Sequence, residues 1–169
     1  MFSTKNIWFC LGITIGVLAG VLVFVAGILP GGTPTWLKIG VWPAFVAWAL
    51  YFAKGGGKDG LIKTMAGNTA GMIAGFLSLL LLSAFTLNNT YVAALVLAII
   101  IVVAAFIMTM CGNFDFVSYV PALFCGCAAV FGWGGGTAIQ PTIALLLTMW
   151  IGAILAHLSN LWGTAMNKA

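Results

Sequence analysis

The chain of 169 residues is 63% hydrophobic and only 5% charged, with six lysines, two acidic residues and one histidine. A soluble domain of this length carries about a quarter charged residues to cover its surface, so a soluble globule is excluded. The lysines are scattered and form no basic stripe, which excludes a nucleic-acid-binding protein. The composition and a mean hydropathy of +1.21 therefore indicate an integral membrane protein.

Apolar runs separated by clusters of Gly, Pro, Asn and Asp predict an all-α integral membrane fold. A span needs about 20 apolar residues to cross the hydrocarbon core, so the length allows six transmembrane helices in a single polytopic domain, residues 1–169. The first run is longer than the apolar segment of a secretory signal peptide, and we expect it to be an uncleaved span. The predicted helices cover residues 6–29, 36–53, 60–86, 90–110, 116–132 and 140–165.

Lysine placement predicts the orientation of these helices. With the N-terminus inside the cell, the outer side receives only Lys38, and the inner side receives Lys5, Lys54, Lys58, Lys63 and Lys168. An excess of lysine on the cytoplasmic side is the usual bias of membrane proteins. We therefore expect both termini to be cytoplasmic.

Three landmarks of the first half of the chain recur in the second half at nearly the same spacing. Pro121 and its following Ala repeat Pro43 and its following Ala, and the glycine triplet 134–136 repeats the triplet 55–57. The pattern G-x3-G-x2-S that starts at Gly71 returns at Gly152, with Ala in place of the second Gly. The chain therefore resembles two copies of a three-helix unit, residues 1–84 and 85–169.

Because three is an odd number, the second copy enters the membrane in the opposite direction to the first. Inverted repeats of this kind recur in transporters, where the solute path lies at the interface between the halves. The repeat thus predicts where a solute site lies.

Small residues at intervals of four follow one face of three predicted helices. Such faces let membrane helices approach closely, and we expect them to serve helix packing more than a pore. The residues concerned are Gly12, Gly16, Gly20, Gly67, Gly71, Gly75, Gly152 and Ala156. The predicted helix 90–110 has no Gly, and we expect it to face lipid or a neighbouring subunit.

Prolines at corresponding positions of the two halves point to a solute site, because a proline inside a membrane helix frees a carbonyl. The alternative is that Pro43 and Pro121 mark the first turn of each helix, where proline does no harm. Three aromatic residues follow the prolines closely, namely Phe45, Trp48 and Phe124. They either line a hydrophobic constriction of the path or pack in the core.

Two polar residues within the predicted spans are candidates for the solute path. His157 is the only ionisable group that the predicted boundaries place deep in a helix, and Asn68 lies in the inner third of its helix. Ionisable residues inside a membrane are costly and mark functional sites by default. A hydroxyl of Ser78 or Ser159 is the expected partner of His157 if that residue is structural. Asp115 is expected to interact with the N-terminus of the helix 116–132.

The sequence predicts no enzyme, metal or cofactor. Cys125 and Cys127 have no further ligand near them in sequence, so we interpret them, like Cys10 and Cys111, as buried free thiols. The glycine triplet before Lys58 follows no strand and precedes no Ser or Thr, which departs from a phosphate-binding loop. No nucleophile and base stand in a catalytic pattern.

Two segments carry a resemblance to a known family. They are Trp42-Pro-Ala-Phe-x2-Trp-Ala-x-Tyr51-Phe-Ala-Lys-Gly-Gly-Gly-Lys-Asp-Gly-Leu61 and Phe116-Val-Ser-Tyr-Val-Pro-Ala-x-Phe124-x-Gly-Cys-Ala. With them, nearly the whole chain resembles a family of small bacterial inner-membrane proteins that is recorded only as a domain of unknown function. The resemblance implies a bacterial origin and a multi-helix membrane domain, and it implies no activity, substrate or site residue.

These observations favour a passive channel or facilitator in the bacterial inner membrane. The absence of acidic residues from the predicted spans argues against ion-coupled pumping, so we expect a small neutral or weakly ionised solute such as urea, ammonia or a short amide. The expected partners are the lipid bilayer and further copies of the chain in a homo-oligomer. Two alternatives stay open: a membrane scaffold or subunit without transport, and a proton-linked transporter that uses His157.

Overall fold

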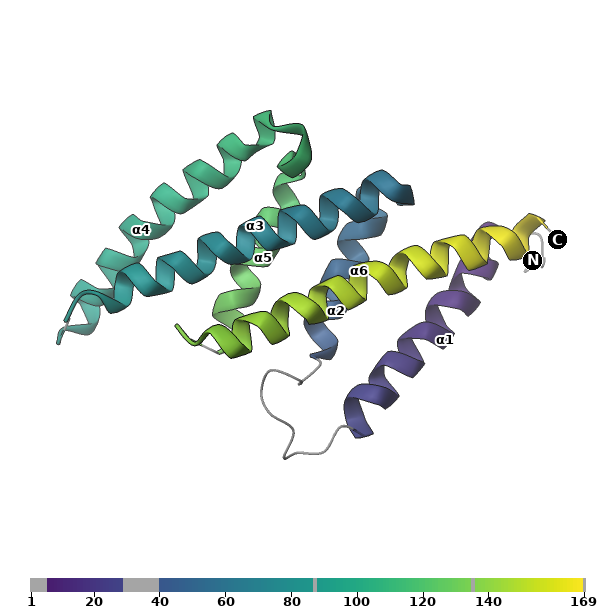
Figure 1. Ribbon diagram of the computed structural model, residues 1–169, viewed down its shortest axis with the longest axis horizontal. Helices are drawn as coiled ribbons and strands as arrows, with labels where there is room; N and C mark the ends of the chain where they lie inside the picture. The colour runs from purple at the N-terminus through teal and green to yellow at the C-terminus, as the bar shows by residue number, and fades with distance from the viewer. Residues whose placement is uncertain (1–5, 29–39, 87, 135, 169) are drawn as a thin grey trace.

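A computed structural model describes residues 6–28, 40–86, 88–134 and 136–168, and every regular element among them is helical (Figure 1). Lys5, Lys38 and Gly135 lie outside these residues, and so do the expectations that rest on them. The elements are α1 (Ile7–Ile28), α2 (Val41–Ala53), α3 (Gly57–Ser83), α4 (Thr90–Met110), the 3-10 turns η2 (Cys111–Asn113) and η3 (Asp115–Val117), α5 (Val120–Trp133) and α6 (Ile139–Lys168).

The predicted helix 116–132 begins later in the structure than the sequence indicated. Asp115–Val117 form a separate 3-10 turn, and α5 begins only at Val120 with Pro121 in its first turn. Proline has no N–H to donate and a φ suited to a helix start, so it favours a beginning at this point. In α2, which begins at Val41, Pro43 is the third helical residue and also lies in the first turn. Both prolines therefore occupy the first turn, where neither frees a carbonyl of its own helix.

Four helices have the length and apolar composition of a membrane span, namely α1, α3, α6 and the helical segment 90–113 that contains α4. The other two apolar helices are shorter, since α2 has 13 residues and α5 has 14. At a rise of 1.5 Å per residue each of these two is about 20 Å long, which is less than the hydrocarbon core of a bilayer. The described residues thus combine four helices of spanning length with two short ones.

The helices are arranged in two layers with a flanking helix on either side (Figure 1). The long helices α3 and α6 run in opposite directions in the layer nearer the viewer, and α2 and α5 cross behind them. The main contacts join α3 to α5 and α6 to α2, while α1 packs against α6 and α4 against α3. The first turn of α3 and the last turn of α6 lie toward the same end of the molecule.

Glycines allow the two layers to meet backbone to backbone. A Cβ at Gly71 would collide with the backbone of Leu123 in α5, and a Cβ at Gly152 would collide with the backbone of Ala44 in α2. Gly126 of α5 meets the backbone of Asn68 in the same way. These approaches fix the distance between the layers, because no other side chain fits there.

The remaining small residues differ in their surroundings. Gly67 and Gly75 of α3 also meet α5, and Ala156 of α6 is buried in a cluster with Trp48 and Tyr51. By contrast, a Cβ at any of the three α1 glycines, Gly12, Gly16 and Gly20, would meet no described atom within 4 Å. The glycine face of α1 is therefore uncovered by the described part of a single chain.

Candidate functional site

The phenol oxygen of Tyr51 is the centre of a polar cluster that joins α2, α3 and α6. It lies 2.9 Å from the backbone N of Gly57, 2.9 Å from Nδ2 of Asn160 and 3.0 Å from Nδ1 of His157. The ring of Tyr51 also meets the imidazole of His157 edge to face, with centroids 5.7 Å apart. We call Tyr51, Gly57, His157 and Asn160 the Tyr51 cluster.

Three hydrogen bonds converge on the Tyr51 oxygen. The N–H groups of Gly57 and Asn160 donate to it, which leaves the hydroxyl proton of Tyr51 available for Nδ1 of His157. The cluster therefore fixes the orientation of the His157 ring against Tyr51.

The glycine triplet between α2 and α3 shapes the loop above the cluster. Gly55, Gly56 and Gly57 have φ values of 98°, 72° and 69°, in the left-handed region that favours glycine. A Cβ at Gly56 would lie 3.1 Å from Nδ2 of Asn160 and 3.4 Å from the Tyr51 hydroxyl. The triplet thus lets the backbone close over Tyr51 and deliver the Gly57 N–H to it.

A second polar feature lies deeper in α3. Thr64 and Asn68 are both 0% exposed, and neither the Thr64 hydroxyl nor either amide atom of Asn68 has a hydrogen-bond partner among the described residues. The two residues lie one helical turn apart on the same face of α3, followed on that face by the buried Met72. Buried polar groups in proteins are nearly always paired, so two unpaired ones in adjacent turns need an explanation.

The other residues predicted for a solute path are not gathered at this place. Phe45 and Phe124 are 39% and 42% exposed, so within one chain both rings lie partly at the surface. Trp48 is buried, stacks on Phe45 at a centroid distance of 6.1 Å, and has an Nε1 without a partner in the described part of the chain. Pro43 is buried and Pro121 exposed. The structure therefore brings His157 together with Tyr51 and Asn160, packs Trp48 in the same buried cluster as Tyr51, and leaves Phe45 and Phe124 partly at the surface.

Two expected partnerships are wrong. Ser78 and Ser159, the expected partners of His157, instead donate to carbonyls of their own helices, those of Ala74 and Ala156. Membrane helices commonly satisfy a serine in this local way, which uses the one proton that the hydroxyl can donate.

The second wrong expectation concerns Asp115, because its carboxylate does not cap the N-terminus of α5. The N-cap of α5 is Tyr119, and no side chain bonds there. Asp115 Oδ1 lies 2.8 Å from Nζ of Lys63, and Lys63 also pairs with Asp59 at 3.4 Å. The hydrogen bond from Lys63 holds the pKa of the Asp115 carboxyl below its usual value. The described charges around this turn therefore tie η3 to the start of α3.

Sequence reasoning missed Tyr51 and Thr64. Tyr51 lies at the end of an apolar run, and its partners His157 and Asn160 are more than 100 positions away. The spacing of His157 and Asn160, which places both on one face of α6, was the available signal. For Thr64 the signal was its position four residues before Asn68.

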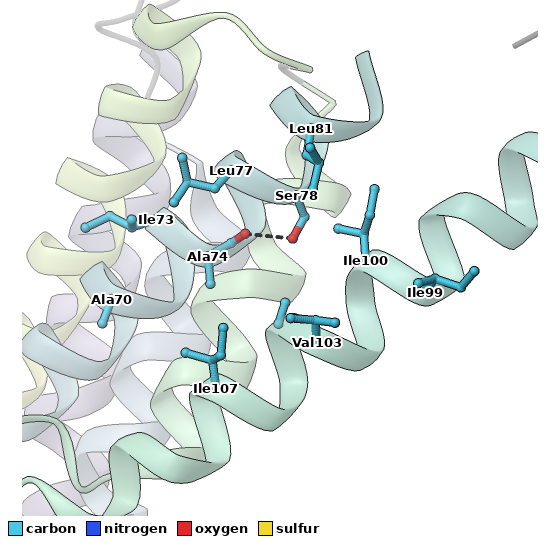
Figure 2. A pocket seen from close by; sticks show the side chains of 11 residues that line it. Ala70, Ile73, Ala74, Leu77, Ser78, Leu81, Ile99, Ile100, Val103 and Ile107 are labelled. Carbon is cyan, nitrogen blue, oxygen red and sulfur yellow. Dashed lines mark hydrogen bonds between the residues drawn. The ribbon is translucent and has the colours of Figure 1, made fainter. Parts of the chain in front are cut away.

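An apolar groove of about 490 Å³ lies between α3 and α4 (Figure 2). Its walls include Ile73 and Leu77 from α3 and Ile99 and Val103 from α4. The hydroxyl of Ser78 in the wall already donates to the Ala74 carbonyl at 2.8 Å. The groove therefore presents hydrocarbon, as expected of a surface that meets lipid chains, and is separate from the polar residues described above.

Within the described residues, no three His, Cys, Asp or Glu side chains gather as a metal site, and Cys111, Cys125 and Cys127 are free thiols. Apart from the imidazole of His157, the polar features consist of hydroxyl, amide and backbone groups. Charged side chains among the described residues belong to the loops and helix ends, at Lys54, Lys58, Asp59, Lys63, Asp115 and Lys168.

Comparisons with known proteins identify a family whose description gives no activity. A model of the family described as "Protein of unknown function (DUF1097)" matches residues 12–164. The chain is also similar to the uncharacterized protein YahC of Escherichia coli (strain K12), with 29% identity over 123 residues that make up 73% of each chain. No solved structure matches.

Proposed function

The chain belongs to the DUF1097 family, as its resemblance predicted, and we propose that it is a passive channel or facilitator for a small neutral or weakly ionised solute. The proposed class includes urea, ammonia and short amides. The observation that carries the proposal is that Tyr51, Thr64 and Asn68 place polar side chains in the buried interior, while the described charged side chains lie in loops or within two turns of a helix end.

The proposal includes an architecture of two inverted three-helix units. The helix lengths support it, since α1 to α3 have 22, 13 and 27 residues and α4 to α6 have 21, 14 and 30. The contacts support it as well. The first unit's α3 packs on α5 of the second, and the second unit's α6 packs on α2 of the first.

One residue pair supports a twofold relation between the units. Trp150 Nε1 donates to the Thr69 hydroxyl at 3.1 Å, and these residues are 81 positions apart. The same shift relates Gly71 to Gly152, which meet corresponding short helices. Residues that correspond to each other touch only near the axis of a twofold, so Thr69 and Trp150 mark the centre of the proposed pair of units.

Transport into proteoliposomes tests the proposal. Purified protein is expected to accelerate the entry of urea, acetamide or ammonia over empty liposomes, at a rate unchanged by pH or sodium gradients. Asp115→Asn is the matched control, because the Asp115 side chain is 93% exposed and lies outside the polar interior, and it should retain the wild-type rate. Entry no faster than in empty liposomes for the whole panel would refute the proposal.

The proton-linked alternative receives less support from the geometry. Nδ1 of His157 is held by the Tyr51 hydroxyl, and the two acidic residues, Asp59 and Asp115, pair with Lys63 instead of His157. We therefore assign His157 a positioning role. Uptake that follows a proton gradient and disappears in His157→Ala would favour the alternative instead.

A membrane subunit without transport is the second candidate. It is favoured by α4, which contributes only Met108 to the buried residues, and by the uncovered glycine face of α1. Both surfaces suit contact with another chain, and the homo-oligomer that we propose would use them. Mild solubilisation and mass measurement distinguish the two candidates: a second copy supports the facilitator, and a stoichiometric foreign protein supports the subunit.

For localisation we propose a bacterial inner membrane with both termini cytoplasmic. The support is that the first turn of α3, which contains Lys58, and the last turn of α6, which contains Lys168, lie toward the same end of the molecule (Figure 1). The usual lysine bias assigns that end to the cytoplasm.

A further inference from the structure

We propose that Thr64 and Asn68 form a binding position for one small neutral molecule that both donates and accepts hydrogen bonds, namely water or an amide of the urea class. The inference rests on the proposed function and names the position and the chemistry that it uses. It starts from the three side-chain atoms of this pair that are buried without a partner among the described residues.

Packing alone does not explain the polar side chains of Thr64 and Asn68. Under the shift that relates Gly71 to Gly152, Thr64 corresponds to Leu145 and Asn68 to Met149. Leu145 and Met149 are 0% exposed, as Thr64 and Asn68 are. The same kind of packing position is therefore filled by hydrocarbon in the second unit. Packing does not demand polar side chains at the first unit's positions, so their polarity serves another purpose.

The side chains of Asn68 and Thr64 offer both hydrogen-bond donors and acceptors to a ligand. A carboxamide has two N–H donors and a carbonyl acceptor, and a threonine hydroxyl donates and accepts. An anion would leave the Asn68 carbonyl unpaired, and a cation would leave its N–H groups unpaired. A neutral molecule with donors and acceptors satisfies both side chains, and urea, short amides and water are the smallest that do so.

A ligand reaches Thr64 and Asn68 only if neighbouring side chains move, because both residues are 0% exposed in the structure. The buried cluster between the layers includes Met72, on the same face of α3 as Asn68, and Met149 of α6. Methionine side chains are unbranched and change rotamer readily. We expect a rotamer change of Met72, one turn from Asn68, to make room for the ligand while the glycine contacts between the layers stay in place.

Nuclear magnetic resonance of protein labelled with [15N]asparagine in lipid nanodiscs tests the inference independently of transport. The side-chain amide signals of Asn68 are identified by their loss in Asn68→Met. They are expected to show exchange or cross-relaxation with water and a saturable shift on addition of urea. Asn113, whose exposed amide donates to the Met110 carbonyl outside the polar interior, should show no saturable shift.

Two variants at hydroxyl positions of α3 sharpen the test. Thr64→Val removes one side of the proposed site and should weaken urea binding severalfold. Ser78→Ala is the matched control, because Ser78 is also buried but already bonded to its own helix, and it should leave binding unchanged.

The outcomes separate this inference from the proposed function. Urea or water contact at Asn68 without any transport keeps the inference and refutes the facilitator. Transport of the panel without contact at Asn68 keeps the facilitator and refutes the inference. An Asn68 amide that contacts neither water nor urea overturns the inference, whatever the transport result.

Discussion

The two ends of the interior, which correspond to each other under the proposed repeat, differ in chemistry. Toward the end where α2 finishes and α3 begins, the interior holds the Tyr51 cluster and Thr64. At the corresponding place of the other end stand Val130, Leu145 and Met149, all buried and apolar. Similar helix packing therefore accommodates polar side chains at one end and apolar side chains at the other.

The largest expected effect tests whether the two ends really share a frame. Gly71→Ala and Gly152→Ala each place a methyl group against the backbone of the opposite short helix, which cannot move away like a side chain. We expect each to destabilise the protein by about 3 kcal/mol, at the upper end of overpacking effects. Thermal unfolding in nanodiscs measures this.

Gly12→Ala in α1 is the control, since no described atom lies within 4 Å of its Cβ position. In nanodiscs that hold a single copy, where the α1 glycine face of the proposed homo-oligomer is free, it should be neutral or slightly stabilising, because alanine favours a helix over glycine. A strong effect at only one of Gly71 and Gly152 would break the equivalence of the two ends.

A polar residue at the apolar end should be costly. Met149→Asn places an amide where Met149 is 0% exposed, among buried residues such as Ala47 and Ala153. We expect a loss of about 2 kcal/mol, the cost of burying a polar group without a partner, and none comparable for Met149→Leu. The comparison fails if Met149→Asn unfolds at the same temperature as wild type.

Removal of the hydroxyl at the polar end should have a smaller effect. Tyr51→Phe deprives His157, Asn160 and the Gly57 N–H of their shared partner, and we expect a loss of about 1–2 kcal/mol because these half-buried groups regain some water. Tyr119→Phe is matched, since it removes a single bond to the Leu50 carbonyl, and it should cost less. Equal unfolding temperatures for the two variants would show that the Tyr51 cluster adds nothing.

The smallest effect concerns the ion pair of Lys63 and Asp115, which is exposed on the carboxylate side. The Asp115 pKa is lowered by Lys63, so the pair contributes stability above the usual carboxyl pKa of about 4 and loses it as the pH falls below that value. The unfolding temperature of Asp115→Asn should therefore be slightly below that of the wild type at about pH 7 and equal to it near pH 2. A difference that grows in acid would contradict this assignment.

The sequence predicted the helices well and the polar site poorly, for physical reasons. Apolar runs and glycine clusters decide where a membrane helix begins and ends, so most bounds were close. The start of α5 was missed because the segment Asp115–Val117 is a 3-10 turn held by Lys63, 52 positions away. The partner of His157 was missed for the same reason, since a contact between distant segments leaves no periodic signal in a sequence.

The shortness of α2 and α5 has a consequence for the surrounding lipid. Two helices of about 20 Å stand beside α3 and α6, which at 27 and 30 residues are about 40–45 Å long. The hydrocarbon core of a bilayer is about 30 Å thick, which is less than the length of the long helices and more than that of the short ones. We therefore expect the long helices to tilt and the lipid beside the short ones to thin. The protein is therefore expected to prefer thin bilayers, and acyl-chain length becomes a variable that sets its orientation and stability.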